Sequence, residues 1–149
     1  MNNELSAFTK QILKSLHEIF QRTGERIIIG NKSSQQIHLV DPTSLMCIEA
    51  EQNYTRWYFS DGTELTLLYQ LHQCEEFITS QARENSLTLA RVGRSSIINF
   101  QYITQLDMTN KIMVLSNRRN FAKKISVPEE SLKKIKEATI LYKEANENK

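Results

Sequence analysis

The sequence predicts a mainly β protein built from short antiparallel strands, with one helix added at each end. Between residues 26 and 126, short runs rich in β-branched and aromatic residues alternate with clusters of turn-forming residues. Asp61-Gly62 separates two such runs and is typical of a two-residue hairpin turn. At both ends of the chain, apolar residues instead recur at steps of three and four, as in amphipathic helices. Together these observations favour an antiparallel β fold flanked by helices.

The first predicted helix covers residues 4–22, and Gly24 is suited to the left-handed conformation just after its end. Its apolar residues fall on one face, at Leu5, Phe8, Ile12, Leu16, Ile19 and Phe20. Two roles are open for this face: packing on the chain's own sheet, or association with another protein surface. We expect residues 1–25 to form this dimerisation or partner element, and residues 26–149 to form one domain with its own core.

Ten strands are predicted to follow, over residues 26–29, 36–40, 45–50, 55–60, 63–68, 88–92, 96–99, 104–108, 112–115 and 120–125. A turn cluster at residues 30–34 joins the first two. A short helix over residues 69–80 interrupts the strands. The last predicted helix covers residues 128–147, where Pro128 suits the first turn and Glu129-Glu130 suit the positive end of the helix dipole.

Composition and charge favour a globular protein with one strongly basic half. The 149 residues are 40% hydrophobic and 24% charged. No apolar run approaches the length of a spanning helix, and the N-terminus lacks the features of a signal peptide, so we expect a cytoplasmic protein. The net charge of +2 conceals an asymmetry: residues 1–82 contain six Lys/Arg and ten Asp/Glu, whereas residues 83–149 contain thirteen and seven. Such asymmetry is expected when one face meets a polyanion, although a solvated basic helix also produces it.

Catalysis is disfavoured by the absence of any nucleophile, phosphate-loop or metalloprotease motif. His17, His38 and His72 lie in three separate predicted elements, and only four glycines are present. Cys47 and Cys74 lie far apart, with no spacing typical of metal ligands. The sequence therefore predicts no enzyme, no metal, no cofactor and no small-molecule substrate.

Residues 91–103, Arg-Val-Gly-Arg-Ser-Ser-Ile-Ile-Asn-Phe-Gln-Tyr-Ile, are the most informative segment of the chain. They place a short loop at residues 93–95 directly before an apolar strand. The loop offers a guanidinium, a hydroxyl and a glycine backbone at one point, with a second hydroxyl just beyond it. These groups suit phosphate oxygens and base edges, although an ordinary polar entry turn to a strand is the plain alternative.

This segment resembles the signature of the LytTR-type DNA-binding domain, found in many bacterial response regulators and in stand-alone regulators. Eight positions match its pattern: Arg91, Val92, Arg94, Ser95, Ile97, Ile98, Asn99 and Ile103. Gly93 replaces the usual histidine, and Leu89 replaces an aromatic residue. Residues 48–55 are similar to the family's "Ile-Glu-Ala-x-x-Asn-Tyr" block, and Ile125-Ser126 to its closing block. The resemblance runs from about residue 37 to residue 135.

The resemblance implies an antiparallel LytTR-like fold whose loops enter successive major grooves of double-stranded DNA. It also implies a transcriptional regulator that reads paired half-sites, so we expect a homodimer. The implied DNA contacts lie in three loops: Asn53, Tyr54, Thr55 and Arg56; Gly93, Arg94 and Ser95; and Arg118, Arg119, Lys123, Lys124 and Ser126. Where the family usually has a basic residue after the closing serine, this chain has Val127-Pro128, so that contact is in doubt.

Several of these residues also suit a purely structural role, without contact to DNA. Tyr54 also suits an aromatic that caps the edge of the sheet, and Asn99 is better suited to fixing a strand end through backbone hydrogen bonds than to touching DNA. Trp57, Ile97 and Ile98 are expected in the core. The competing function is a protein-interaction module, in which the N-terminal helix docks on a regulatory partner such as a membrane-bound inhibitor. Affinity for DNA that falls steeply with salt would separate the two.

Overall fold

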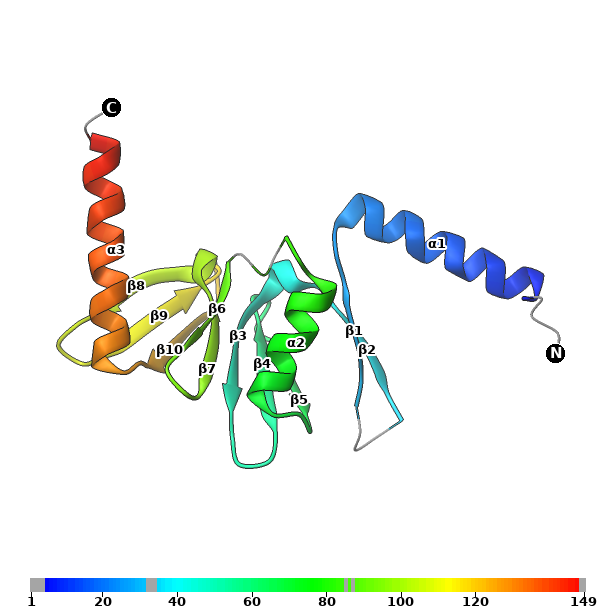
Figure 1. Ribbon diagram of the computed structural model, residues 1–149, viewed down its shortest axis with the longest axis horizontal. Coiled ribbons are helices and arrows are strands. Elements are labelled where there is room, and N and C mark those ends of the chain that lie inside the picture. Colours follow the sequence, from blue (N-terminus) through cyan, green and yellow to red (C-terminus); the bar gives the residue numbers. More distant parts are fainter. Residues whose placement is uncertain (1–4, 32–34, 85, 87, 148–149) are drawn as a thin grey trace.

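The computed structural model describes residues 5–31, 35–84, 86 and 88–147 of the chain (Figure 1). A five-stranded sheet occupies the centre of an elongated molecule. A three-stranded sheet and the C-terminal helix lie at one end, and a two-stranded hairpin and the N-terminal helix lie at the other. The predicted mainly β architecture with a helix at each end is confirmed.

The central sheet has the order β5-β4-β3-β7-β6, and every neighbouring pair is antiparallel. Its strands are β3 (Leu45–Ala50), β4 (Thr55–Phe59), β5 (Glu64–Leu67), β6 (Leu89–Val92) and β7 (Ser96–Asn99). The register of β3 shifts between Leu45 and Cys47, so that Met46 and Cys47 both belong to one core cluster while Leu45 and Ile48 belong to the other. Apolar side chains thus project from both faces of the sheet, so each face must pack against another part of the chain.

One face of the central sheet is covered by α2 (Leu71–Gln81) and by the hairpin of β1 (Ile27–Gly30) and β2 (Ile37–Val40). Trp57, Ile48 and Ile97 point to this side, where they pack with Cys74 and Ile78 of α2. The hairpin buries Ile27 and Ile29 in the same cluster. It is further attached by the Gln81 side chain, which accepts from Ile28 N at 2.9 Å and donates to Ile28 O at 3.3 Å.

The other face is covered by the three-stranded sheet, with the order β10-β9-β8. Its strands are β8 (Ile103–Asp107), β9 (Ile112–Ser116) and β10 (Ala122–Ser126). Met113, Leu115 and Ile125 pack against Tyr58 and Ile98 of the central sheet. The final helix, α3 (Glu129–Glu147), adds the fully buried Leu132, while its C-terminal half extends beyond the sheet. The result is a layered structure with one core on each side of the central sheet.

The N-terminal helix α1 (Ala7–Thr23) leaves the far end of the hairpin and points away from the sheets (Figure 1). Its apolar side chains are exposed, and Phe8 retains 71% of its accessible surface. The sequence left two roles open for this face, packing on the chain's own sheet or association with another protein surface. In this structure the face does not pack on the chain's own sheet. No helix among the described residues is long and apolar enough to cross a membrane.

Most elements match their predicted positions to within two residues, and the differences have local causes. The α2 helix begins at Leu71 rather than at residue 69, because Gln70 and Gln73 form a reciprocal capping box. Tyr69 instead packs against the core, edge-to-face with Phe77, and its hydroxyl donates to the carbonyl of Gly30 in the hairpin. Two short 3-10 helices, Pro42–Ser44 and Phe100–Tyr102, were not predicted. Most of the predicted turn at residues 30–34 lies outside the described residues.

Candidate nucleic-acid interface

Three loops from separate parts of the chain meet at one end of the sheets, which we call the loop edge. It comprises residues 52–54 between β3 and β4, residues 93–95 between β6 and β7, and the β10–α3 junction at Ser126, with Lys111 from the β8–β9 turn. A backbone hydrogen bond of 2.7 Å from Ala50 N, at the end of β3, to Ser95 O places the first two loops at the same end of the sheet. A shallow groove lined by Arg94, Ser95, Asn110, Lys111, Ser126 and Pro128 joins the second loop to Lys111 and to the β10–α3 junction.

The first loop is held in shape by its own polar contacts. Glu51 N donates to Tyr54 O at 2.9 Å, and the Tyr54 hydroxyl donates to a Glu51 carboxylate oxygen at 2.5 Å. That hydrogen bond raises the pKa of Tyr54, so the phenol remains a protonated donor at neutral pH. Arg56 also faces Glu51, with its Nε 3.6 Å from the carboxylate. The contacts fix the loop while Asn53 stays exposed at its tip.

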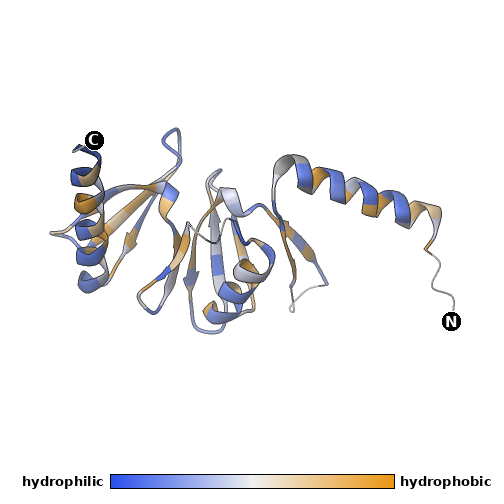
Figure 2. Ribbon diagram, turned by 45° about the horizontal axis from the view of Figure 1, so that its top comes forward, coloured by the Kyte–Doolittle hydropathy of each residue, from blue (hydrophilic) through white to orange (hydrophobic). Residues whose placement is uncertain are grey.

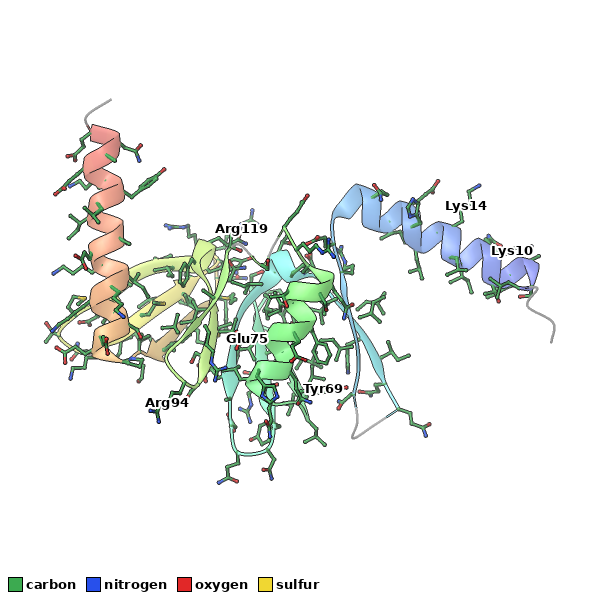
Figure 3. The ribbon with its side chains drawn as sticks, viewed as in Figure 1. Lys10, Lys14, Tyr69, Glu75, Arg94 and Arg119 are labelled. Carbon is green, nitrogen blue, oxygen red and sulfur yellow. The ribbon has the colours of Figure 1, made fainter. Side chains whose placement is uncertain are left out.

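Arg94 is the exposed cation of the second loop. Its neighbour Arg91 is engaged, because Nη1 lies 2.8 Å from the Glu75 carboxylate and Nη2 donates to the Arg94 carbonyl at 3.1 Å. These bonds fix the backbone of the turn at Arg94. Among the described residues, no hydrogen bond or ion pair engages the Arg94 guanidinium itself. Figure 3 shows this side chain projecting away from the sheets.

The second and third loops touch through Gly93 and Pro128. Gly93 has φ of +68°, in the left-handed region that favours glycine. A Cβ placed on it would lie 2.8 Å from Cγ of Pro128. Two of the three places at which this chain departs from the expected family residues, Gly93 and Val127-Pro128, are therefore in direct contact. The sequence could not show this, because 35 positions separate them.

Thr55 must be removed from the predicted contact residues. Its side chain is fully buried, where Oγ1 accepts from Trp57 Nε1 at 3.1 Å and lies 3.4 Å from Cys74 Sγ. The alternation along β4 explains the error, since Thr55 and Trp57 share the face that packs on α2. Arg56, between them, is half-buried on the opposite face.

Replacing Thr55 with valine should lower the free energy of unfolding by about 1–3 kcal/mol, because the buried Trp57 Nε1–H loses its acceptor. Thermal and urea denaturation measure this loss. The control is Thr66→Val on β5, where the side chain is exposed and little change is expected. Equal stability of the two variants would show that the hydroxyl of Thr55 has no structural role.

The Lys123 ammonium is also engaged in contacts within the protein. Its ammonium lies 3.9 Å from the centre of the Tyr58 ring and 3.5 Å from the Glu49 carboxylate. Both partners belong to the central sheet, so this lysine joins the two sheets. Its neighbour Lys124 is exposed, as expected for the opposite face of β10.

Arg118 and Arg119 lie at the opposite end of the strands, which we call the far edge. There Asn117 Nδ2 donates to the Ser60 carbonyl at 2.7 Å, joining the β9–β10 and β4–β5 turns. The intervening strand β10 separates this turn from Ser126 by about 13 Å, at roughly 3.3 Å per residue. Figure 3 shows Arg94 and Arg119 at opposite ends. The predicted third loop is therefore split, and only its Ser126 end belongs to the loop edge.

Lys111 is a candidate that sequence reasoning missed. It occupies the β8–β9 turn with φ of +56°, and its ammonium lies 3.4 Å from the Glu129 carboxylate. Its side chain is 55% exposed, which leaves it accessible beside the groove. The available signal was the segment Thr109-Asn110-Lys111, a short polar turn that ends on a cation between two alternating strands.

Asn99 has a structural role and does not belong to the loop edge. Asn99 is buried, its Nδ2 donates to the Leu45 carbonyl at 2.9 Å, and its Oδ1 accepts from Gln101 N at 3.2 Å. This confirms that it fixes a strand end.

Burial raises the pKa of Cys47 to about 12 and also raises that of Cys74, so neither is a thiolate at neutral pH. The described residues contain no group of three potential metal ligands among His, Cys, Asp and Glu.

Comparison with known proteins agrees with this fold. One solved structure, the LytTr DNA-binding domain of a putative methyl-accepting/DNA response regulator from Bacillus cereus, is similar in fold with a TM-score of 0.51. The two share 18% sequence identity over 74% of this chain and 94% of that chain. No curated protein matches. The sequence pattern of the LytTr DNA-binding domain family matches residues 35–140, which include every element from β2 to most of α3. The chain therefore belongs to the LytTR DNA-binding domain family.

Proposed function

We propose that this protein is a transcriptional regulator that binds double-stranded DNA sequence-specifically, with the loop edge inserted into major grooves. Membership of the family supports DNA binding in general. The observation that carries the finer proposal is the convergence of three loops at one edge around the free guanidinium of Arg94. A projecting loop presents such a group to a base edge without requiring a recognition helix.

The side chains of the loop edge divide into base readers and phosphate ligands. Arg94 offers the two parallel donors that match guanine or a phosphate. Asn53, Ser95 and Ser126 are short hydrogen-bonding side chains exposed around it. Lys111 and Lys124 are exposed cations that need less exact placement and suit phosphates.

The partner implied by this function is promoter DNA with paired half-sites, bound by two copies of the chain. One loop edge covers a short stretch of duplex, and a second copy would double the number of contacts. We further propose a cytoplasmic, non-catalytic protein.

Binding to promoter DNA and to a scrambled duplex at several salt concentrations tests the proposal. We expect preference for the promoter duplex and a loss of affinity with salt, at a slope near −3 per bound copy for about three phosphate contacts. Fluorescence anisotropy with labelled duplexes measures both quantities. Equal affinity for the two duplexes would contradict sequence-specific reading, and absence of binding to either would contradict the function itself.

A protein-interaction module is the second candidate function, and the exposed apolar face of α1 favours it. In that case the β domain would carry the helix to a regulatory partner and would bind DNA weakly or not at all. The same assay separates the candidates, because only the DNA-binding regulator gives a salt-dependent preference for one duplex.

A further inference from the structure

The apolar face of α1 is a surface that the rest of the described chain leaves exposed. Leu5, just before the helix, and Phe8, Ile12 and Leu13 within it are each more than 40% exposed. Phe8 and Ile12 lie one turn apart on the apolar side with Leu13 at its margin, whereas Lys10 and Lys14 lie one turn apart on the polar side. Figure 2 shows hydrophobic residues recurring along the whole helix. A helix with such a stripe gains stability when the stripe is covered.

The outer face of the β1–β2 hairpin is a second exposed apolar surface in the same part of the molecule. Ile28 pairs with Leu39 across the hairpin, and Ile37 pairs with Gly30. The side chains of Ile28, Leu39 and Ile37 alternate with the buried ones and lie on the side away from the core. They are 44%, 53% and 68% exposed. Gly30 carries no side chain, and the space that a Cβ would occupy is open.

The rim of this hairpin surface is acidic. Ile37 and Leu39 line an open groove together with Asp41, Asp61 and Glu64. With the apolar stripe of α1 on the hairpin, Lys10 and Lys14 point away from this rim, so the match between the two surfaces is apolar.

The connection between α1 and β1 holds these two surfaces apart within one chain. Gly24 has φ of +94° and turns the backbone at the end of the helix. The Arg26 guanidinium donates to the Glu25 carbonyl at 2.8 Å and lies 3.7 Å from the Asp41 carboxylate. These contacts fix the connection on its course away from the hairpin. The apolar stripe of α1 is thus directed outward, toward a second molecule.

We propose that α1 of each chain docks on the outer face of the β1–β2 hairpin of a second copy, so that two chains exchange helices in a symmetric dimer. The contact is isologous, because each chain supplies one helix and one groove. Seven exposed apolar side chains per chain would be covered, which corresponds to roughly 1,000 Å² in total if each contributes about 70 Å². That reaches the minimum of about 1,000 Å² for a biological interface and lies below the roughly 1,200–2,000 Å² of stable ones.

The mass of the full-length chain in solution, measured without DNA, tests the dimer. We expect a dimer at micromolar concentration, and at least a tenfold weaker dimer after either Phe8→Glu on α1 or Ile37→Glu on the hairpin. The control is Leu141→Glu, an exposed apolar residue of α3 at the other end of the molecule, which should remain dimeric. Circular dichroism establishes that each variant is folded.

Three outcomes would overturn this interface: a monomeric intact chain, a dimer insensitive to Ile37→Glu, or a dimer broken by Leu141→Glu. Insensitivity to Ile37→Glu alone would indicate that two α1 helices pair with each other. Lys10→Glu with Lys14→Glu is a second control, because these side chains lie on the polar side of α1 and the dimer should be retained. The inference rests on the paired chains of the proposed function. Measurement without DNA keeps a failure of this interface distinct from a failure of DNA binding.

Discussion

Replacing Arg94 with alanine should reduce affinity for the promoter duplex by roughly 5- to 150-fold, corresponding to about 1–3 kcal/mol. The reason is that the Arg94 guanidinium projects from the loop edge with no partner among the described residues, so all of its donors are available to DNA. Discrimination between the promoter and a duplex altered at one guanine should fall at the same time, because a bidentate base contact is lost. Anisotropy titrations against both duplexes measure affinity and preference together.

Arg119→Ala is the matched control for this change. It removes the same charge from an exposed turn, but Arg119 lies at the far edge. We expect at most a twofold loss of affinity and unchanged base preference. If Arg119→Ala matched Arg94→Ala in both respects, the effect would be one of net charge, and the loop edge would not be the reading surface.

Replacing Gly93 with alanine should lower the free energy of unfolding by about 2–3 kcal/mol. Two effects contribute: the left-handed φ of +68° costs a non-glycine residue about 1–2 kcal/mol, and the added Cβ would lie 2.8 Å from Pro128 Cγ. For a chain of this length the loss corresponds to a fall in Tm of roughly 5–10 °C. Calorimetry measures it directly, and affinity for DNA should fall as well, because residues 93–95 form the second loop.

Gly62→Ala separates the two contributions. Gly62 has φ of +89°, but its Cβ would meet only Phe121 at 3.5 Å, an ordinary contact distance. This variant should show the backbone cost alone. The double variant Gly93→Ala with Pro128→Ala should regain the stability lost to the contact between the new Cβ and Pro128. It should not regain the stability lost to the left-handed backbone conformation. Equal losses for Gly93→Ala and Gly62→Ala would mean that Pro128 yields freely and does not hold the two loops together.

Local sequence patterns were sufficient for most of the fold. Alternation, turn residues and helical spacing depend on neighbours within a few positions, so they located β3, β7 and the Asp61-Gly62 hairpin closely. The start of α2 was misplaced because Gln70 and Gln73 are unusual capping residues. The register shift in β3 was not predictable either, since it depends on how the two cores share the side chains of Met46 and Cys47.

The candidate site was only partly predictable, because long-range packing decides which polar groups remain exposed. Arg94 and Ser95 lie in a turn, where exposure follows from local geometry. Lys123 and Thr55 each lie in a strand, and their surroundings depend on which sheet or helix covers that face. Sequence alone could not show that Lys123 lies against Tyr58. The predicted strand over residues 120–125 already separated Arg119 from Ser126, but the resemblance grouped both in one contact loop.

The two cysteines occupy separate cores, on opposite sides of the central sheet. Cys74 lies on the buried face of α2, and Cys47 faces the three-stranded sheet. Because both thiols are fully buried, an alkylating reagent reaches each one only when its own side of the sheet opens. Alkylation of Cys74 therefore reports the detachment of α2, and alkylation of Cys47 reports the separation of the two sheets. The native chain thus contains a separate chemical probe for the opening of each layer.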